Sequence, residues 1–123
     1  MINIKDELMP SYRQAVAERE KKEENERRII ETGAVSFIEK IVIPEFRHMH
    51  SMNPTMSTLH ITYEFVSKGL LFRNNIGESS VFDSDYSEKQ IKGAIGIAAR
   101  CGIESLEGFA EGKPLYHFIL NFE

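Results

Sequence analysis

The chain has 123 residues, 41% of them hydrophobic and 28% charged, a composition typical of one folded domain. Its net charge of −4 leaves no basic surplus for tracking a phosphate backbone. Its acids are interleaved with bases, which argues against an acidic mimic of nucleic acid. We therefore expect no nucleic-acid partner.

We expect neither secretion nor membrane insertion from the sequence pattern. Its single cysteine, Cys101, cannot form an internal disulfide. The first ten residues, MINIKDELMP, include acids and contain no apolar run of signal-peptide length. No uncharged apolar run approaches the roughly 20 residues that span a bilayer. We expect a cytoplasmic protein with no membrane partner.

The stretch 17–28 reads AEREKKEENERR, with ten charged residues out of twelve and no large apolar one. Acids precede bases at i,i+4 spacing, and each such pair stabilises a helix by about 0.2–0.5 kcal/mol. The pairs are Glu18–Lys22, Glu23–Arg27 and Glu24–Arg28. No apolar residue recurs at heptad spacing, so this is not a coiled coil. We expect residues 1–33 to form a charged helical arm.

Two caps compete for the start of this arm. Ser11 has Gln14 three residues later, the spacing of a capping box, and Asp6 offers an earlier start. Apolar residues on either side of the charged run need partners that one small domain does not supply, which favours a homo-oligomer. The candidate oligomer contacts are Tyr12, Val16, Ile29 and Ile30.

A compact domain is expected over residues 34–123. Gly33 weakens the arm helix, and the sequence leaves open whether the helix continues through it. Apolar residues then recur at helical period as far as Met49. Pro44 lies inside this pattern and predicts a kink or a break near Ile43. A strand over residues 41–43 is the alternative.

Strand patterns follow. Residues 58–65, TLHITYEF, alternate apolar and polar, and a short turn leads into residues 70–73, which predicts a hairpin. A polar loop is expected over residues 74–85. A weak strand at 106–109 precedes a turn and residues 116–122, which are apolar on both faces and predict an internal strand.

A further helix is expected to begin at Glu88. Ser87 and Gln90 have capping-box spacing, and Gly102 fits a left-handed cap at the far end. Gly93 and Gly96 suggest close backbone approach. The predicted class is α+β: two N-terminal helices and a mainly antiparallel sheet of about four strands in two hairpins, with the intervening helix packed on it.

The densest cluster of possible metal ligands is HMHSMNPTM, residues 48–56, whose histidines and methionines would suit a soft metal such as Cu(I). On a helix, however, His48 and His50 would point about 200° apart and could not share an ion. Histidines near a helix C-terminus are also favoured by its dipole. We expect neither metal nor cofactor, although the sequence leaves open whether this segment binds a metal.

One acid–base set is conceivable. His60 and Glu64 lie on the polar face of the first strand, and His117 reaches that face if the strand registers agree. An ordinary polar sheet face explains the same residues. Cys101 falls on the apolar face of its helix and is expected to be buried. No catalytic residue is assigned.

The loop after the first hairpin mixes aromatic residues with an arginine, a combination typical of interface hot spots. The candidate partner-binding residues are Phe72, Arg73, Ile76, Phe82 and Tyr86. The alternative is that the apolar members of this set fix the loop to the core.

The leading hypothesis is a small non-enzymatic protein that binds another protein. In size and composition the chain resembles accessory or inhibitor proteins of phages and prophages. A small-ligand binder is the alternative, holding a nucleotide or other anion at the helix N-terminus near Ser87 or in a cleft between subunits. A third hypothesis is a small hydrolase that uses His60, Glu64 and His117.

Overall fold

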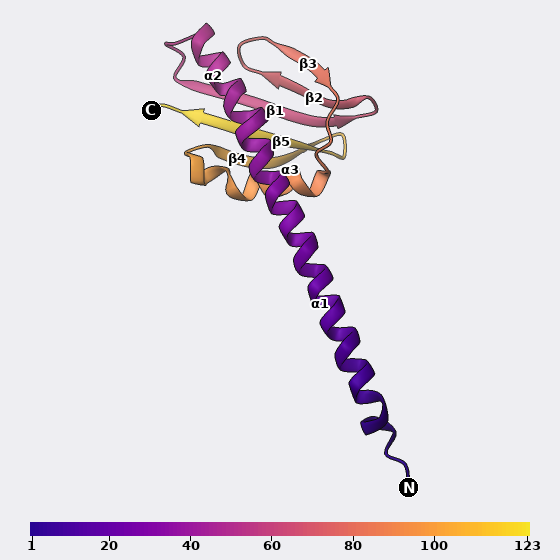
Figure 1. Cartoon of the computed structure of the whole chain (residues 1–123). Helices are drawn as coiled ribbons and strands as arrows, with labels where there is room; N and C mark the ends of the chain where they lie inside the picture. Colours follow the sequence, from indigo (N-terminus) through magenta and orange to yellow (C-terminus); the bar gives the residue numbers. More distant parts are fainter.

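The computed structural model describes all residues from 1 to 123. One long helical run crosses a five-stranded antiparallel sheet, and a shorter helix lies beside it (Figure 1). The helices are α1 (Ile4–Phe37), α2 (Ile43–Met52) and α3 (Glu88–Ile97). The strands are β1 (Thr58–Val66), β2 (Gly69–Asn74), β3 (Ser79–Phe82), β4 (Glu104–Ala110) and β5 (Lys113–Asn121).

The predicted α+β class is confirmed, and both predicted hairpins are present as β1–β2 and β4–β5. The strand order is β3-β2-β1-β5-β4, so β5 is internal as expected. The sheet has five strands instead of about four, because β3 occupies part of the expected polar loop. β3 has four residues, and apolar and polar residues do not clearly alternate along it. It is a strand because it pairs with β2, for example through Val81 and Leu71.

α1 begins earlier than either expected cap. The Asn3 side chain accepts a hydrogen bond from the Asp6 backbone N–H at 3.3 Å. The helix then continues through Gly33, the point that the sequence left open. A Cβ at Gly33 would overlap the Gln90 side chain of α3, whose Nε2 donates to the Ile29 carbonyl at 3.3 Å. Gly33 therefore serves close packing and does not end the helix.

Pro44 neither ends the helical run nor forces a strand. A π-helical segment, Ile38–Val42, joins α1 directly to α2, and Ile43 donates its N–H to the Ile38 carbonyl. A proline ring clashes with the carbonyl four residues earlier, and a wider turn relieves such a clash. The alternative strand over residues 41–43 is wrong.

The core lies between the helices and one face of the sheet. The alternation predicted for the first strand is confirmed, with Leu59, Ile61 and Tyr63 buried. On β5, Tyr116 and Phe118 are buried on the same face. All three helices lie over this face (Figure 1).

The two ends of the α3 region follow the sequence pattern. Both halves of the capping box between Ser87 and Gln90 are formed, at 3.2 and 2.9 Å. Gly102 has a φ of 75° and caps the far end in the left-handed conformation. α3 therefore begins at Glu88 as predicted.

Close approach is confirmed at one of the two α3 glycines. A Cβ at Gly93 would lie 3.1 Å from the Cβ of Ala34 on α1. Nothing lies within 4 Å of a Cβ at Gly96, so that expectation was wrong. Cys101 was expected to be buried, but it is exposed. The helix tightens into a 3-10 turn over Ala98–Cys101, and the smaller number of residues per turn moves the Cys101 side chain out of the apolar face.

Candidate functional site

The N-terminal part of α1 projects away from the domain as an arm (Figure 1). Ala34 is the first buried residue of the chain. Ile4, Leu8 and Tyr12 are 60%, 56% and 65% exposed. Because they are four residues apart, their side chains lie in one stripe that covers an arc of about 80° around the helix axis. We call these three residues the apolar tip.

The structure places the four candidate oligomer contacts in different surroundings. Tyr12 belongs to the apolar tip, and Val16 is half-buried one turn further along. Ile29 is 64% exposed at the base of the arm. Ile30 is half-buried at the crossing with α3, near Gly93. Sequence reasoning missed Ile4 and Leu8 because it began the helix too late.

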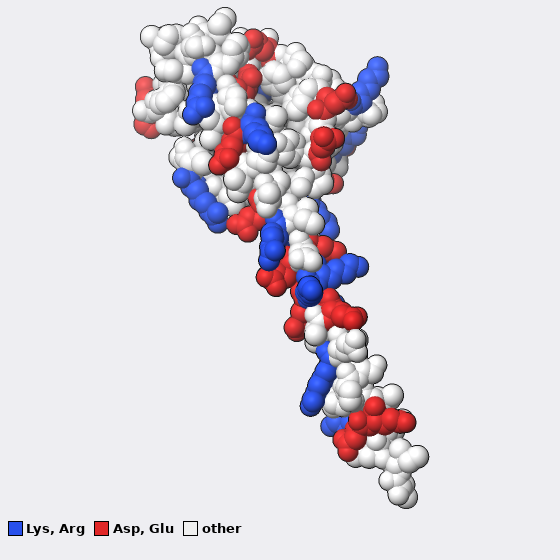
Figure 2. All heavy atoms as spheres, in the orientation of Figure 1, with Lys and Arg blue, Asp and Glu red and all other residues white.

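The middle of the arm carries charges of both signs side by side (Figure 2). The first turn of α1, beside the apolar tip, also carries two acidic residues and a lysine. Of the three predicted pairs, Glu24–Arg28 lies within ion-pair distance, at 3.5 Å. Arg19 and Glu23 form a second pair at 3.9 Å. These pairs are solvent-exposed, so each stabilises the helix only locally and by a few tenths of a kcal/mol.

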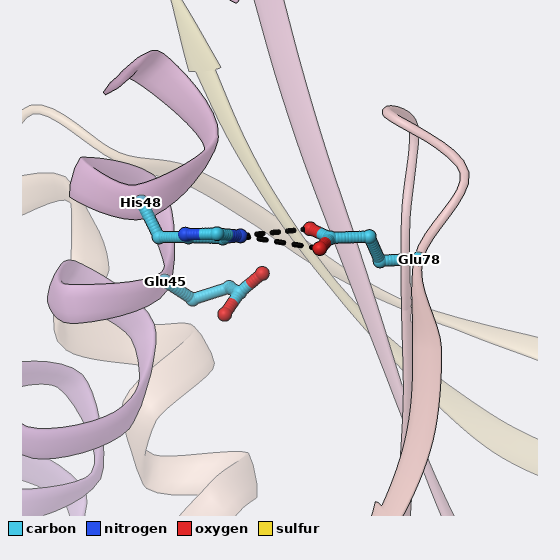
Figure 3. Close-up of side chains that lie close together, drawn as sticks. All are labelled: Glu45, His48 and Glu78. Carbon is cyan, nitrogen blue, oxygen red and sulfur yellow. Dashed lines mark hydrogen bonds and ion pairs between the residues drawn. The ribbon is translucent and has the colours of Figure 1, made fainter. Parts of the chain in front are cut away.

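A second group, which we call the Glu–His–Glu cluster, comprises Glu45, His48 and Glu78 (Figure 3). Glu45 and His48 lie one turn apart on α2, and Glu78 faces them from the loop between β2 and β3. His48 Nε2 is 3.0 and 3.2 Å from the two carboxylate oxygens of Glu78. One nitrogen or oxygen from each residue lies within 4.8 Å of the others.

Asn74 holds both carboxylates of this cluster. Its Nδ2 donates to Glu45 Oε1 at 2.9 Å and to Glu78 Oε1 at 3.1 Å. Its Oδ1 accepts from the backbone N–H groups of Ile76 and Glu78, which fixes the amide in the turn. The Asn74 hydrogen bond, followed by His48, lowers the pKa of Glu78.

Sequence reasoning grouped His48 with the wrong residues. α2 continues to Met52, and His50 lies against the Phe122 ring at 5.5 Å while His48 faces Glu78. The Glu-x-x-His spacing of Glu45 and His48 was visible in the sequence. Glu78 could not be added to it, because only the turn after β2 brings that residue to α2.

His60 and His117 meet on the sheet face away from the helices. His60 Nε2 lies 2.9 Å from His117 Nδ1, and Thr62 Oγ1 is within 3.4 Å of both nitrogens. The register pairs Thr62 with His117, which confirms that His117 shares this face. Burial, followed by the charge of His60, lowers the pKa of His117. Glu64 forms no hydrogen bond with either imidazole, so the pair has no carboxylate to orient it.

Two of the five candidate partner-binding residues lie side by side, since the ring centroids of Phe72 and Phe82 are 6.4 Å apart. Phe72, Ile76, Phe82 and Tyr86 are partly buried against the core. The Tyr86 hydroxyl lies 2.9 Å from Ser36 Oγ, and its ring packs edge-on against Phe37. Arg73 is exposed on β2. A role for these residues in partner binding stays a prediction.

The largest cleft, about 670 Å³, lies between the base of the arm and the segment before α3. Arg28 is its single basic residue, and Asp83 and Asp85 contribute two carboxylates. These carboxylates disfavour the anion considered for this helix N-terminus. The Ser87 side chain also already accepts from the Gln90 N–H.

No family model, curated protein or solved structure matches the chain. None of its helices is both long and apolar enough to cross a membrane. The structure therefore defines a class by architecture alone: a small α+β protein with a projecting helical arm.

Proposed function

We propose that this protein works by binding another protein through the apolar tip of its arm. The observation that carries the proposal is the exposure of Ile4, Leu8 and Tyr12, which lie on one stripe of a helix with nothing packed against it. Burying such side chains stabilises a complex by about 25 cal/mol per Å² of apolar surface. Large side chains on one helical stripe are also how a helix docks in an apolar groove.

The arm sets this surface apart from the domain. The part of α1 before Ile30 spans about 40 Å at 1.5 Å per residue. Its charged middle, residues 17–28, keeps the helix solvated, and the core is formed without any residue before Ala34. The arm therefore contributes little to the fold, while its length allows the tip to reach a surface distant from the domain.

The partner can be a different protein or a second copy of this chain. A second copy would form the homo-oligomer expected from the sequence, with tips packed against one another. A different partner would fit an accessory or inhibitor protein of the phage or prophage type, acting in the cytoplasm. Both forms require the same apolar tip.

The test is a double substitution, Leu8→Glu with Tyr12→Glu, in the full chain. The proposal predicts that the variant loses the assembly seen with the parent chain in native mass spectrometry of protein purified from its own cells. Glutamate is a good helix former, so the arm should stay helical by circular dichroism. Ala17→Glu with Asn25→Glu is the matched control, because it adds the same two negative charges at exposed positions outside the tip and should leave the assembly unchanged.

An unchanged assembly in the tip variant would refute the proposal. So would a monomeric parent chain that captures no partner.

A second candidate function is supported by the cleft at the base of the arm. At about 670 Å³ it is large enough for a small molecule, and Arg28 and Gln90 offer polar contacts. Its two aspartates favour a neutral or cationic ligand over a nucleotide. Denaturing mass spectrometry of the small molecules released from purified protein would test this candidate, and an empty cleft would count against it.

A further inference from the structure

The Glu–His–Glu cluster brings two carboxylates together at the surface with one imidazole and no lysine or arginine. Glu45 and Glu78 both accept from the same neutral Asn74 amide. No lysine or arginine lies within ion-pair distance of either carboxylate. Two nearby carboxylates repel each other, and a bound cation would relieve that repulsion.

The ligand chemistry is specific because an imidazole stands beside the carboxylates. A Glu-x-x-His spacing on one helix face recurs in metal sites built into helical bundles. Glu45 and His48 have that spacing, and Glu78 adds a third donor from a different segment. Calcium and magnesium prefer oxygen ligands alone, whereas imidazole with carboxylates suits zinc and its neighbours in the first transition row.

The geometry is close to that of a coordinated ion. Zinc bonds of about 2.0–2.2 Å in a tetrahedron place ligand atoms about 3.3 Å apart. His48 Nε2 already lies 3.0 Å from Glu78 Oε1, and the three donor atoms fall within 4.8 Å of one another. Small side-chain rotations would complete the set. Asn74 would orient both carboxylates from outside, as second-shell hydrogen bonds do in metal sites.

Solvent can reach the cluster. The side chains of His48 and Glu78 are each 44% exposed, so an ion could enter and keep water in its remaining positions. Glu45 also lines a cleft of about 300 Å³ together with Lys40 and Tyr63. From these observations we propose that Glu45, His48 and Glu78 bind one divalent transition-metal ion, with zinc the best fit.

The experiment is calorimetric titration of the untagged full chain with zinc, together with cobalt(II) as a spectroscopic probe. The expected result is one zinc per chain and a visible cobalt absorption that zinc removes. Glu45→Gln keeps the shape of the side chain and an oxygen that can accept from Asn74, so the variant should fold. It should weaken zinc binding by at least about 10-fold, because even the loss of a residue that only hydrogen-bonds to a metal ligand weakens binding that much. His48→Gln should do the same.

His50→Gln is the matched control, because His50 lies on the same helix but faces Phe122. It should bind zinc as the parent chain does. Circular dichroism of each variant checks that the fold is kept.

Three results would overturn the proposal. One is the absence of zinc binding to the parent chain, which would leave an ion pair between His48 and Glu78 and nothing more. Another is zinc binding that is lost in His50→Gln and kept in Glu45→Gln. The third is calcium or magnesium binding that survives His48→Gln, which would mean a site built from oxygens alone.

Discussion

Gly93 on α3 faces Ala34 on α1 so closely that a Cβ at Gly93 would lie 3.1 Å from the Cβ of Ala34. Ala34 is the first buried residue after the arm, with 1% of its surface exposed. The crossing of α1 over α3 is therefore the place where the arm joins the folded domain. Gly33 makes a second close approach here, to Gln90.

This crossing predicts opposite effects for two alanine substitutions on one helix. Gly93→Ala should destabilise the protein by about 1 kcal/mol, because crowding against Ala34 outweighs the gain in helix propensity. Gly96→Ala meets nothing within 4 Å and should stabilise it by about 0.5–1 kcal/mol. Urea unfolding followed by circular dichroism measures both. Equal effects of the two substitutions would contradict the close packing.

The capping box predicts the effect of removing one hydroxyl. Ser87→Ala should lower the free energy of unfolding by about 1 kcal/mol, because the Gln90 N–H loses its acceptor. Ser79→Ala on the exposed edge strand is the control, with a change within about 0.5 kcal/mol. Thermal unfolding of the two variants side by side checks the difference. A Ser87→Ala protein as stable as the parent would show that the cap contributes nothing.

The imidazole pair predicts a pH dependence. A single proton can lie between His60 Nε2 and His117 Nδ1, and burial holds the pKa of His117 below its usual 6.5. The unfolded chain therefore takes up a proton at this position before the folded chain does. This contribution to stability is present above about pH 6.5 and is lost as the pH falls through the lower folded pKa.

His117→Asn should flatten this dependence, whereas His50→Gln should leave it in place. Unfolding curves between pH 5 and pH 7.5, with the nitrogen chemical shifts of the imidazoles, supply the measurement. A His117 that titrates above 6.5 would show that the sign is wrong.

The exposure of Cys101 predicts its chemistry. The thiol should react stoichiometrically with a disulfide reagent in the native protein, at a rate close to that in the unfolded chain. Labelling is followed by the absorbance of the released thiolate. A thiol that reacts only after denaturant is added would show that Cys101 is buried, as the helical pattern predicted, and would contradict its exposure in the structure.

Elements with local signals could be predicted from the sequence. The alternation of residues 58–65 defines β1, and the Ser87–Gln90 spacing gives the start of α3. An early start of α1 was also readable, from Asn3 with Asp6 and Glu7 in the first turn. This start was missed from the sequence because Ser11 also has the spacing of a good N-cap.

Features that depend on distant residues could not be predicted. β3 is a strand because β2 pairs with it, and its own four residues show no clear alternation. Glu78 joins Glu45 and His48 through a turn fixed by Asn74, across about thirty residues of chain. Cys101 is exposed because the helix tightens into a 3-10 turn, a change that helical periodicity does not reveal.

The most direct test of the central claim is the native mass of the assembly formed with and without the arm. The fragment 29–123 retains every buried residue, since the first of them is Ala34, and should keep the circular dichroism of the folded domain. If the apolar tip binds a partner, the full chain will show an assembly heavier than a monomer and the fragment will not. An assembly of the same composition with and without residues 1–28 would contradict the account.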